Sequence, residues 1–108
     1  MLRGLAALDD VELTAIVNTG DDDSIYGLHI APDIDTVIYT MAGREGQHGW
    51  GLAGDSHVVI EALEKFPLDT WFQIGDTDMA TNLFRTARIR DGWTLSQVTT
   101  ALAAVFGV

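Results

Sequence analysis

The sequence predicts an α/β fold in which helices alternate with the strands of a mostly parallel sheet. Apolar periodicity switches along the chain between short β-rich runs and longer helical stripes. Residues 13–17 are β-rich and almost continuously apolar, which is typical of a strand buried on both faces. With 108 residues, of which 47% are hydrophobic, the chain has the material for one packed domain or part of one.

The first elements are expected to be a helix end, a strand and a weaker β segment. Residues 2–8 have the pattern of the last turns of a helix. The strand at 13–17 follows, and an aspartate-rich loop comes after it. Residues 24–31 favour β structure, with an interruption at Gly27.

A helix is predicted to begin near Pro32, because proline is favoured in the first helical turn. Apolar residues then recur at helical spacing, so one face would be buried through Ile34, Val37, Ile38 and Met41. Residues 42–54 contain five of the glycines, which predicts a loop that is unusually long for a small domain.

Three further helices are expected. The first covers 56–66, with Ser56 as a candidate cap and an apolar face made by Val59, Leu63 and Phe66. The second ends near Arg90, and its apolar stripe consists of Ala80, Leu83, Phe84 and Ala87. Thr94 and Gln97 form a capping box for the last helix, whose buried stripe is Leu95, Val98, Leu102 and Val105. Residues 70–74 are a short apolar run whose type is left open.

Composition argues against several classes of protein. The formal net charge is −10, so a basic face for nucleic acid is not expected. The absence of cysteine argues against a disulfide framework and favours a reducing, cytoplasmic location. No apolar run approaches the roughly 18 residues of a membrane span, and no signal peptide is expected at the N-terminus.

Five aspartates lie within fifteen residues, at Asp21, Asp22, Asp23, Asp33 and Asp35. Carboxylates this close repel one another, and either a divalent cation or full solvation relieves that repulsion. Two or three carboxylates together with substrate phosphates are a common way to hold Mg²⁺. The alternative is a solvated acidic turn followed by a helix cap.

A second acidic segment, Gly75-Asp76-Thr77-Asp78, precedes a helix, and either aspartate could serve only as its cap. Arg85 and Arg88 lie on that helix away from the predicted apolar stripe, so they either reach a phosphate or form a solvated face.

The glycine-rich loop carries two further candidates. Trp50 could close over a flat heterocycle, or it could simply pin a surface loop. His48 could act as a ligand or base, but the histidines of this chain show no metal-binding spacing.

Four motifs occur in order along the chain: Val17-Asn-Thr-Gly-Asp-Asp22, Gly27-Leu-His-Ile-Ala-Pro-Asp-Ile-Asp-Thr36, His48-Gly-Trp-Gly51, and Trp71-Phe-Gln-Ile-Gly-Asp-Thr-Asp-Met-Ala-Thr81 with Arg85-Thr86. Together they resemble the 2-phospho-L-lactate transferase family of coenzyme F420 biosynthesis, the CofD type. The resemblance covers essentially the whole chain. It implies a Rossmann-like three-layer α/β fold with a mostly parallel sheet, of which residues 1–108 would be a partial domain.

The resemblance also implies a Mg²⁺-dependent reaction. The terminal ribityl hydroxyl of the deazaflavin Fo would attack the diphosphate of lactyl- or enolpyruvyl-diphosphoguanosine. GMP would leave, and the product would be F420-0 or its dehydro form. A homodimer is left open.

By resemblance, the catalytic residues would be Asp33 and Asp35. The metal ligands would be Asp21, Asp22 and Asp35. The substrate-binding residues would be Asp21, Asp22, Trp50, Asp76, Asp78, Thr81 and Arg85.

The sequence departs from the family at two positions and in length. Thr77 stands where the family usually has arginine, and Asn82 where it usually has histidine. Family members are far longer, so the chain is expected to be an N-proximal fragment that folds poorly or self-associates and is inactive alone. Two alternatives stay open: a non-catalytic acidic module that binds a ligand or a protein, and a related transferase with another acceptor.

Overall fold

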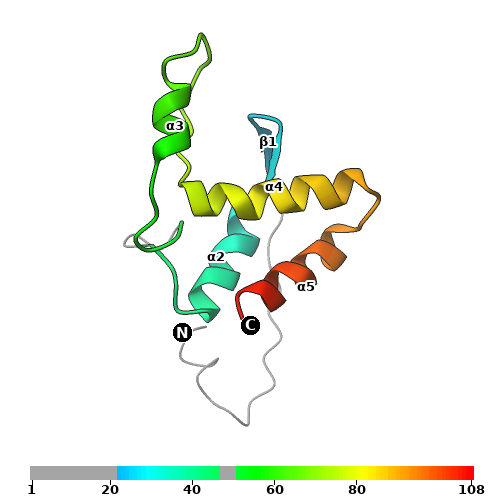
Figure 1. The fold of residues 1–108 in the computed structure, drawn as a ribbon. Coiled ribbons are helices and arrows are strands. Elements are labelled where there is room, and N and C mark those ends of the chain that lie inside the picture. The colour runs from blue at the N-terminus through cyan, green and yellow to red at the C-terminus, as the bar shows by residue number, and fades with distance from the viewer. Residues whose placement is uncertain (1–21, 47–50) are drawn as a thin grey trace.

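The computed structural model describes residues 22–46 and 51–108. Its elements in chain order are β1 (Asp23–Ile25), β2 (Leu28–Ile30), α2 (Pro32–Met41), α3 (Val58–Leu63), α4 (Asp76–Arg90) and α5 (Leu95–Val105). In Figure 1, α4 lies across α2 and α5, while α3 extends away from them to one side. The helix expected over 2–8 and the strand expected over 13–17 lie outside the described residues.

The α/β class is confirmed, but the sheet of the described residues has two antiparallel strands. The parallel sheet of the prediction is therefore not confirmed. Ile25 pairs with Leu28, and the two-residue turn between them is made by Tyr26 and Gly27 at φ 56° and 76°. Two positive φ values are the hallmark of a tight type I′ hairpin. The β segment interrupted at Gly27 is thus a hairpin whose turn contains that glycine.

Helix α2 begins at Pro32 as predicted, and the residue before it, Ala31, is fully buried. Ile34 and Ile38 are buried as expected. The face turns further than the apolar pattern indicates, because its other buried members are Asp35 and Tyr39. These two residues stand four apart and therefore share a face of the helix.

The predicted face of α3 is wrong. The helix is short, and its buried residue is Ile60, whereas Val59 and Phe66 are exposed. The predicted cap is also wrong, because the N-cap position is His57 rather than Ser56.

The predicted apolar stripe of α4 holds only at Phe84, which packs against buried residues of α2 and α5. Leu83 is 53% exposed. The buried residues of α4 are Thr81, Asn82 and Arg85. The physical reason is that this side of α4 faces the polar side of α2, where a buried carboxylate needs a cation and hydrogen-bond donors.

Helix α5 follows its prediction closely. The Thr94 hydroxyl accepts from the Gln97 N–H, and the Gln97 side chain accepts from the Thr94 N–H, which completes the capping box. Val98 and Leu102 are buried, although Val105 is 73% exposed. The main apolar cluster gathers buried residues of α2 and α5 with Leu52; a second joins the hairpin to Ile74.

Within the described part of the chain, no helix combines the length and the apolar character that a membrane crossing requires.

Candidate functional site

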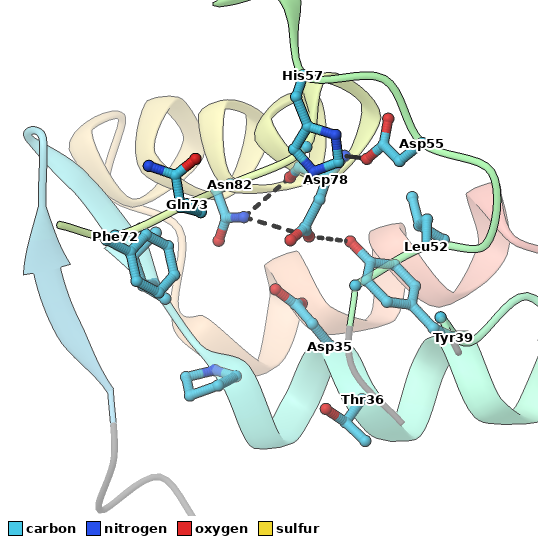
Figure 2. Close-up of a pocket in the computed structure, with 15 residues that line it drawn as sticks. Asp35, Thr36, Tyr39, Leu52, Asp55, His57, Phe72, Gln73, Asp78 and Asn82 are labelled. Atoms are coloured by element: carbon cyan, nitrogen blue, oxygen red, sulfur yellow. Dashed lines mark hydrogen bonds between the residues drawn. The ribbon is translucent and has the colours of Figure 1, made fainter. Parts of the chain in front are cut away.

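A cavity of about 490 Å³ opens between α2, the start of α4 and the segments that precede α3 and α4. Figure 2 shows its polar wall, in which side chains of α2 and α4 point toward one another. The labelled residues that line it are Asp35, Thr36, Tyr39, Leu52, Asp55, His57, Phe72, Gln73, Asp78 and Asn82.

Asp35 lies on the wall of this cavity and forms a buried ion pair with Arg85. The Arg85 guanidinium also donates to the backbone oxygen of His29 at 3.0 Å and to Asn82 Oδ1 at 2.7 Å. Burial raises the pKa of Asp35 to about 6, although the charge of Arg85 opposes this rise. Arg85 is fully buried, so the alternative that it forms a solvated face is wrong.

Asp78 is the second carboxylate of the wall. The Tyr39 hydroxyl donates to Asp78 Oδ1 at 2.7 Å, and Asn82 Nδ2 donates to the Asp78 backbone oxygen at 2.8 Å. Burial raises the pKa of Asp78, and the hydrogen bond from Tyr39 opposes this. Burial also raises the pKa of Tyr39, so its hydroxyl stays protonated and acts as a donor at neutral pH.

These contacts form one polar ladder, defined by Asp35, Arg85, Asn82, Asp78 and Tyr39. Asn82 is its centre, because its amide accepts from Arg85 and donates to Asp78. The ladder holds two carboxylates and one guanidinium. The cavity wall therefore carries more acceptor than donor capacity, which suits a ligand with hydroxyl groups or a cation.

Asp55 caps the start of α4 from outside that helix. Its two carboxylate oxygens accept from the backbone N–H groups of Thr77 at 2.9 Å and Asp78 at 3.0 Å. Burial acts to raise the pKa of Asp55, but these N–H donors outweigh it and the pKa is lowered. Gly75 passes close to this carboxylate, since a Cβ at that position would collide with Asp55 Oδ2.

Asp76 caps α3 instead of its own helix, which corrects the simple capping alternative. Its oxygens accept from the N–H groups of Val58 and Val59 at 2.9 Å each, and from the Ser56 hydroxyl at 2.7 Å. The hydrogen bond from the Val59 N–H and those from Ser56 and Val58 lower the pKa of Asp76.

The acidic cluster is divided by the fold. Asp22 pairs with His29 at 3.2 Å and lines a second hollow of about 430 Å³ on the hairpin side. One Asp22 oxygen, Oδ1, is buried and has no hydrogen-bond partner in the described part of the chain. Asp23 is exposed on β1, and Asp33 is half-buried in the first turn of α2 and lines neither of these two cavities.

The predicted site residues thus fall into four groups, of which Asp22 at the second hollow and Asp33 outside both cavities are the first. Asp35 and Asp78 meet at the main cavity. Asp76, Thr81 and Arg85 lie behind its wall or at its rim without lining it. Asp21, His48 and Trp50 lie outside the described residues. Over residues 22–46 and 51–108, no three His, Asp or Glu side chains gather as metal ligands, so the Mg²⁺ site that includes Asp21 stays a prediction.

Sequence reasoning missed Tyr39, Asp55, Phe72 and the bridging role of Asn82. The signal for Tyr39 was available, because it stands four residues after Asp35 on a predicted helix. No local signal marks Asp55, since the N–H groups that it accepts from lie 22 and 23 residues away.

Comparison with known proteins gives a consistent result. A family model described as 2-phospho-L-lactate transferase CofD matches residues 1–108. The phosphoenolpyruvate transferase of Mycobacterium ulcerans (strain Agy99) is 48% identical over 93 residues, which cover 84% of this chain and 28% of that protein. Proteins of the same name are 46% identical over 93 residues in Mycobacterium leprae (strain TN) and 42% identical over 95 residues in Mycobacterium tuberculosis (strain ATCC 25618 / H37Rv). The matched residues make up 84% and 86% of this chain but 28% and 29% of those two relatives. The chain therefore spans less than a third of their length.

Proposed function

This chain belongs to the 2-phospho-L-lactate transferase CofD family, and from this premise we propose that it is part of a transferase of coenzyme F420 biosynthesis. The enzyme would move a phospholactyl or phosphoenolpyruvyl group from a diphosphoguanosine donor to the deazaflavin Fo. The curated relatives are named phosphoenolpyruvate transferases, which favours the enolpyruvyl donor. The proposal includes a Rossmann-like parallel fold in which residues 1–108 are a partial domain, and a cytoplasmic location.

One observation carries the proposal from the structural side. Two carboxylates with raised pKa values, the buried Asp35 and the half-buried Asp78, line a cavity of about 490 Å³. Cavities of this volume are typical of small-molecule sites. Perturbed acids in such a cavity are candidates for function, because burying them is costly unless chemistry or binding needs them.

In the proposed reaction, the ribityl hydroxyl attacks the donor phosphorus, the bond from that phosphorus to the GMP oxygen breaks, and the hydroxyl proton is released. We assign Asp35 the role of accepting that proton and passing it to solvent. Arg85 holds the Asp35 carboxylate in place, and its charge limits the rise in the pKa of Asp35. Asp33 remains the second predicted catalytic carboxylate; it stands one position after Pro32 and two before Asp35, both of which line the cavity. Phosphoryl transfer depends mainly on such positioning and on charge.

One carboxylate oxygen supports the predicted metal. Asp22 presents a buried carboxylate oxygen without a partner in the described region, and hard divalent cations prefer such oxygens. We propose that Asp21, Asp22 and Asp35 hold Mg²⁺. When bound, the ion would neutralise charge on the diphosphate.

The test is Asp35→Asn in the full-length protein, with GMP release measured from each donor in the presence of Fo. We expect kcat/KM to fall at least a hundredfold, because the amide cannot take the proton. Glu61→Gln removes an exposed carboxylate from α3 and serves as the matched control, with activity expected within twofold. Full activity of Asp35→Asn would contradict the assignment.

Two extensions of this assay separate the alternatives. Asp33→Asn, run beside Asp35→Asn, shows whether one or both predicted catalytic carboxylates matter. Replacing Fo by other hydroxyl acceptors tests a related transferase, which the departures at Thr77 and Asn82 favour.

A further inference from the structure

The start of α3 and the start of α4 exchange their capping carboxylates. Asp55, which precedes α3, accepts from N–H groups of α4, and Asp76 of α4 accepts from N–H groups of α3. The Asp76 N–H donates in turn to the backbone oxygen of Ser56 at 2.8 Å. The two segments are therefore joined in both directions.

This exchange takes the place of local caps. The N-cap positions of α3 and α4 are His57 and Gly75, and neither makes a side-chain capping hydrogen bond in the described structure. The first N–H groups of a helix have no partner inside it, so an external acceptor is needed to fix the first turn. Here each first turn depends on a residue of the other segment.

The joined segments form one rim of the cavity. Asp55, His57, Gly75 and Asp78 all line it. Asp78 is held twice: Asp55 binds its backbone N–H at 3.0 Å, and Tyr39 binds its carboxylate at 2.7 Å. A shift of the first turn of α4 would therefore move a carboxylate that faces the ligand space.

We propose that Asp55 and Asp76 are positioning residues, which set the place of Asp78 and His57 at the cavity through the backbone N–H groups that they bind. The inference rests on the proposed function for its kinetic consequence, but the exchange of caps can be tested without it. Gly75 belongs to the same device, because its missing side chain leaves the space that the Asp55 carboxylate occupies.

The first test is a double-mutant cycle on the unfolding of the full-length protein. Gly75→Ala should raise the equilibrium constant of unfolding at least tenfold when Asp55 is present, because a Cβ would collide with the Asp55 carboxylate. In the background of Asp55→Ala, Gly75→Ala should raise the equilibrium constant of unfolding less than threefold, because the obstructing carboxylate is gone. Equal costs in the two backgrounds would overturn the proposed contact.

The second test measures kcat and KM separately at a temperature where every variant is folded. We expect Asp55→Ala to lower kcat ten- to hundredfold, since small displacements of a positioned group have effects of this size. Asp55→Asn should recover part of the loss, because its amide oxygen can still accept one N–H. The control is Asp69→Asn, an exposed carboxylate whose acceptor contact is to the N–H of Trp71, with activity within twofold.

The outcomes distinguish the two proposals. A full-length protein without transferase activity would contradict the proposed function, while the double-mutant cycle would still decide the exchange of caps. Coupling in the cycle together with unchanged kcat and KM for folded Asp55→Ala would overturn the positioning role.

Discussion

Arg85 of α4 and Asp35 of α2 neutralise each other inside the molecule, with side-chain exposures of 0% and 8%. They stand 50 residues apart in the sequence. Breaking a buried pair by removing one partner costs more than the pair itself contributes, because the remaining charge is left without compensation. Loss of the Arg85 guanidinium should therefore weaken the packing of α2 against α4.

We predict that Arg85→Met lowers the free energy of unfolding by about 3–5 kcal/mol. Asp35 would lose its cation, and the backbone oxygen of His29 would lose a donor. Urea denaturation measures the change. Arg88→Met is the control: its guanidinium is partly exposed and lies over the rings of Phe84 and Trp93, so its removal should cost about 1 kcal/mol or less. Similar losses for both variants would contradict the special role of Arg85.

The pH dependence of stability should carry the signature of Asp35. Its pKa rises from 3.8 to about 6 on folding, so between these values the folded state holds a proton that the unfolded state has lost. The stability from this group is fully present below pH 3.8 and is lost as the pH rises through 6. We predict that the stability difference between the parent and Asp35→Asn falls by about 3 kcal/mol across this window.

Asp55 provides the contrast for that measurement. Its pKa is lowered on folding despite its partial burial, because the N–H groups of Thr77 and Asp78 favour the charged form. Its stabilising effect is present above the unfolded pKa and is lost as the pH falls through the folded pKa. The difference in free energy of unfolding between the parent and Asp55→Asn should therefore grow with rising pH. Parallel pH profiles for the two variants would refute both assignments.

How much could be predicted depends on how local each interaction is. Helices α2 and α5 were predictable, since Pro32 and the Thr94–Gln97 box act within one turn and the apolar spacing marks Ile34, Ile38, Val98 and Leu102. The buried face of α4 was not, because hydrophobicity places arginine outside. Arg85 is buried since its partner Asp35 comes from another helix, which no periodicity within α4 reveals.

The candidate site shows the same limit. Asp35 and Asp78 were singled out by their acidic motifs, and both line the cavity. The capping alternative for Asp76 points to the wrong helix, because the N–H groups of Val58 and Val59 that it binds lie 18 and 17 residues earlier in the chain. Spacing alone carries no information about which of two neighbouring helix ends a carboxylate will reach.

The capping box of α5 gives a local prediction. Thr94→Ala removes the hydroxyl that accepts from the Gln97 N–H, and it should lower the free energy of unfolding by about 1 kcal/mol, within a usual range of roughly 0.5–2. Ser96→Ala changes an exposed hydroxyl on the same helix and should stay within about 0.5 kcal/mol. Thermal denaturation of the two variants checks this, and an equal effect of both would speak against the cap.

The last prediction concerns the tie between the hairpin and the cavity. The Tyr26 hydroxyl donates to the backbone oxygen of Phe72 at 2.7 Å and accepts from the Phe72 N–H at 3.1 Å. One side chain thus satisfies both backbone groups of a residue that lines the cavity. Tyr26→Phe keeps the ring but leaves the two groups without this partner, so we expect a loss of about 1–3 kcal/mol.

Amide hydrogen exchange makes that prediction specific. The Phe72 N–H should exchange faster in Tyr26→Phe, because its acceptor is gone, while the amides of α5 keep their protection relative to the new global stability. Trp71→Phe, at a neighbouring side chain that is 66% exposed, should change stability by less than about 0.5 kcal/mol and leave Phe72 protected. If Phe72 exchanges equally in the parent and in Tyr26→Phe, the hydroxyl does not hold this segment, and the wall of the cavity on the hairpin side must depend on apolar packing with Ile74 and Met79 instead.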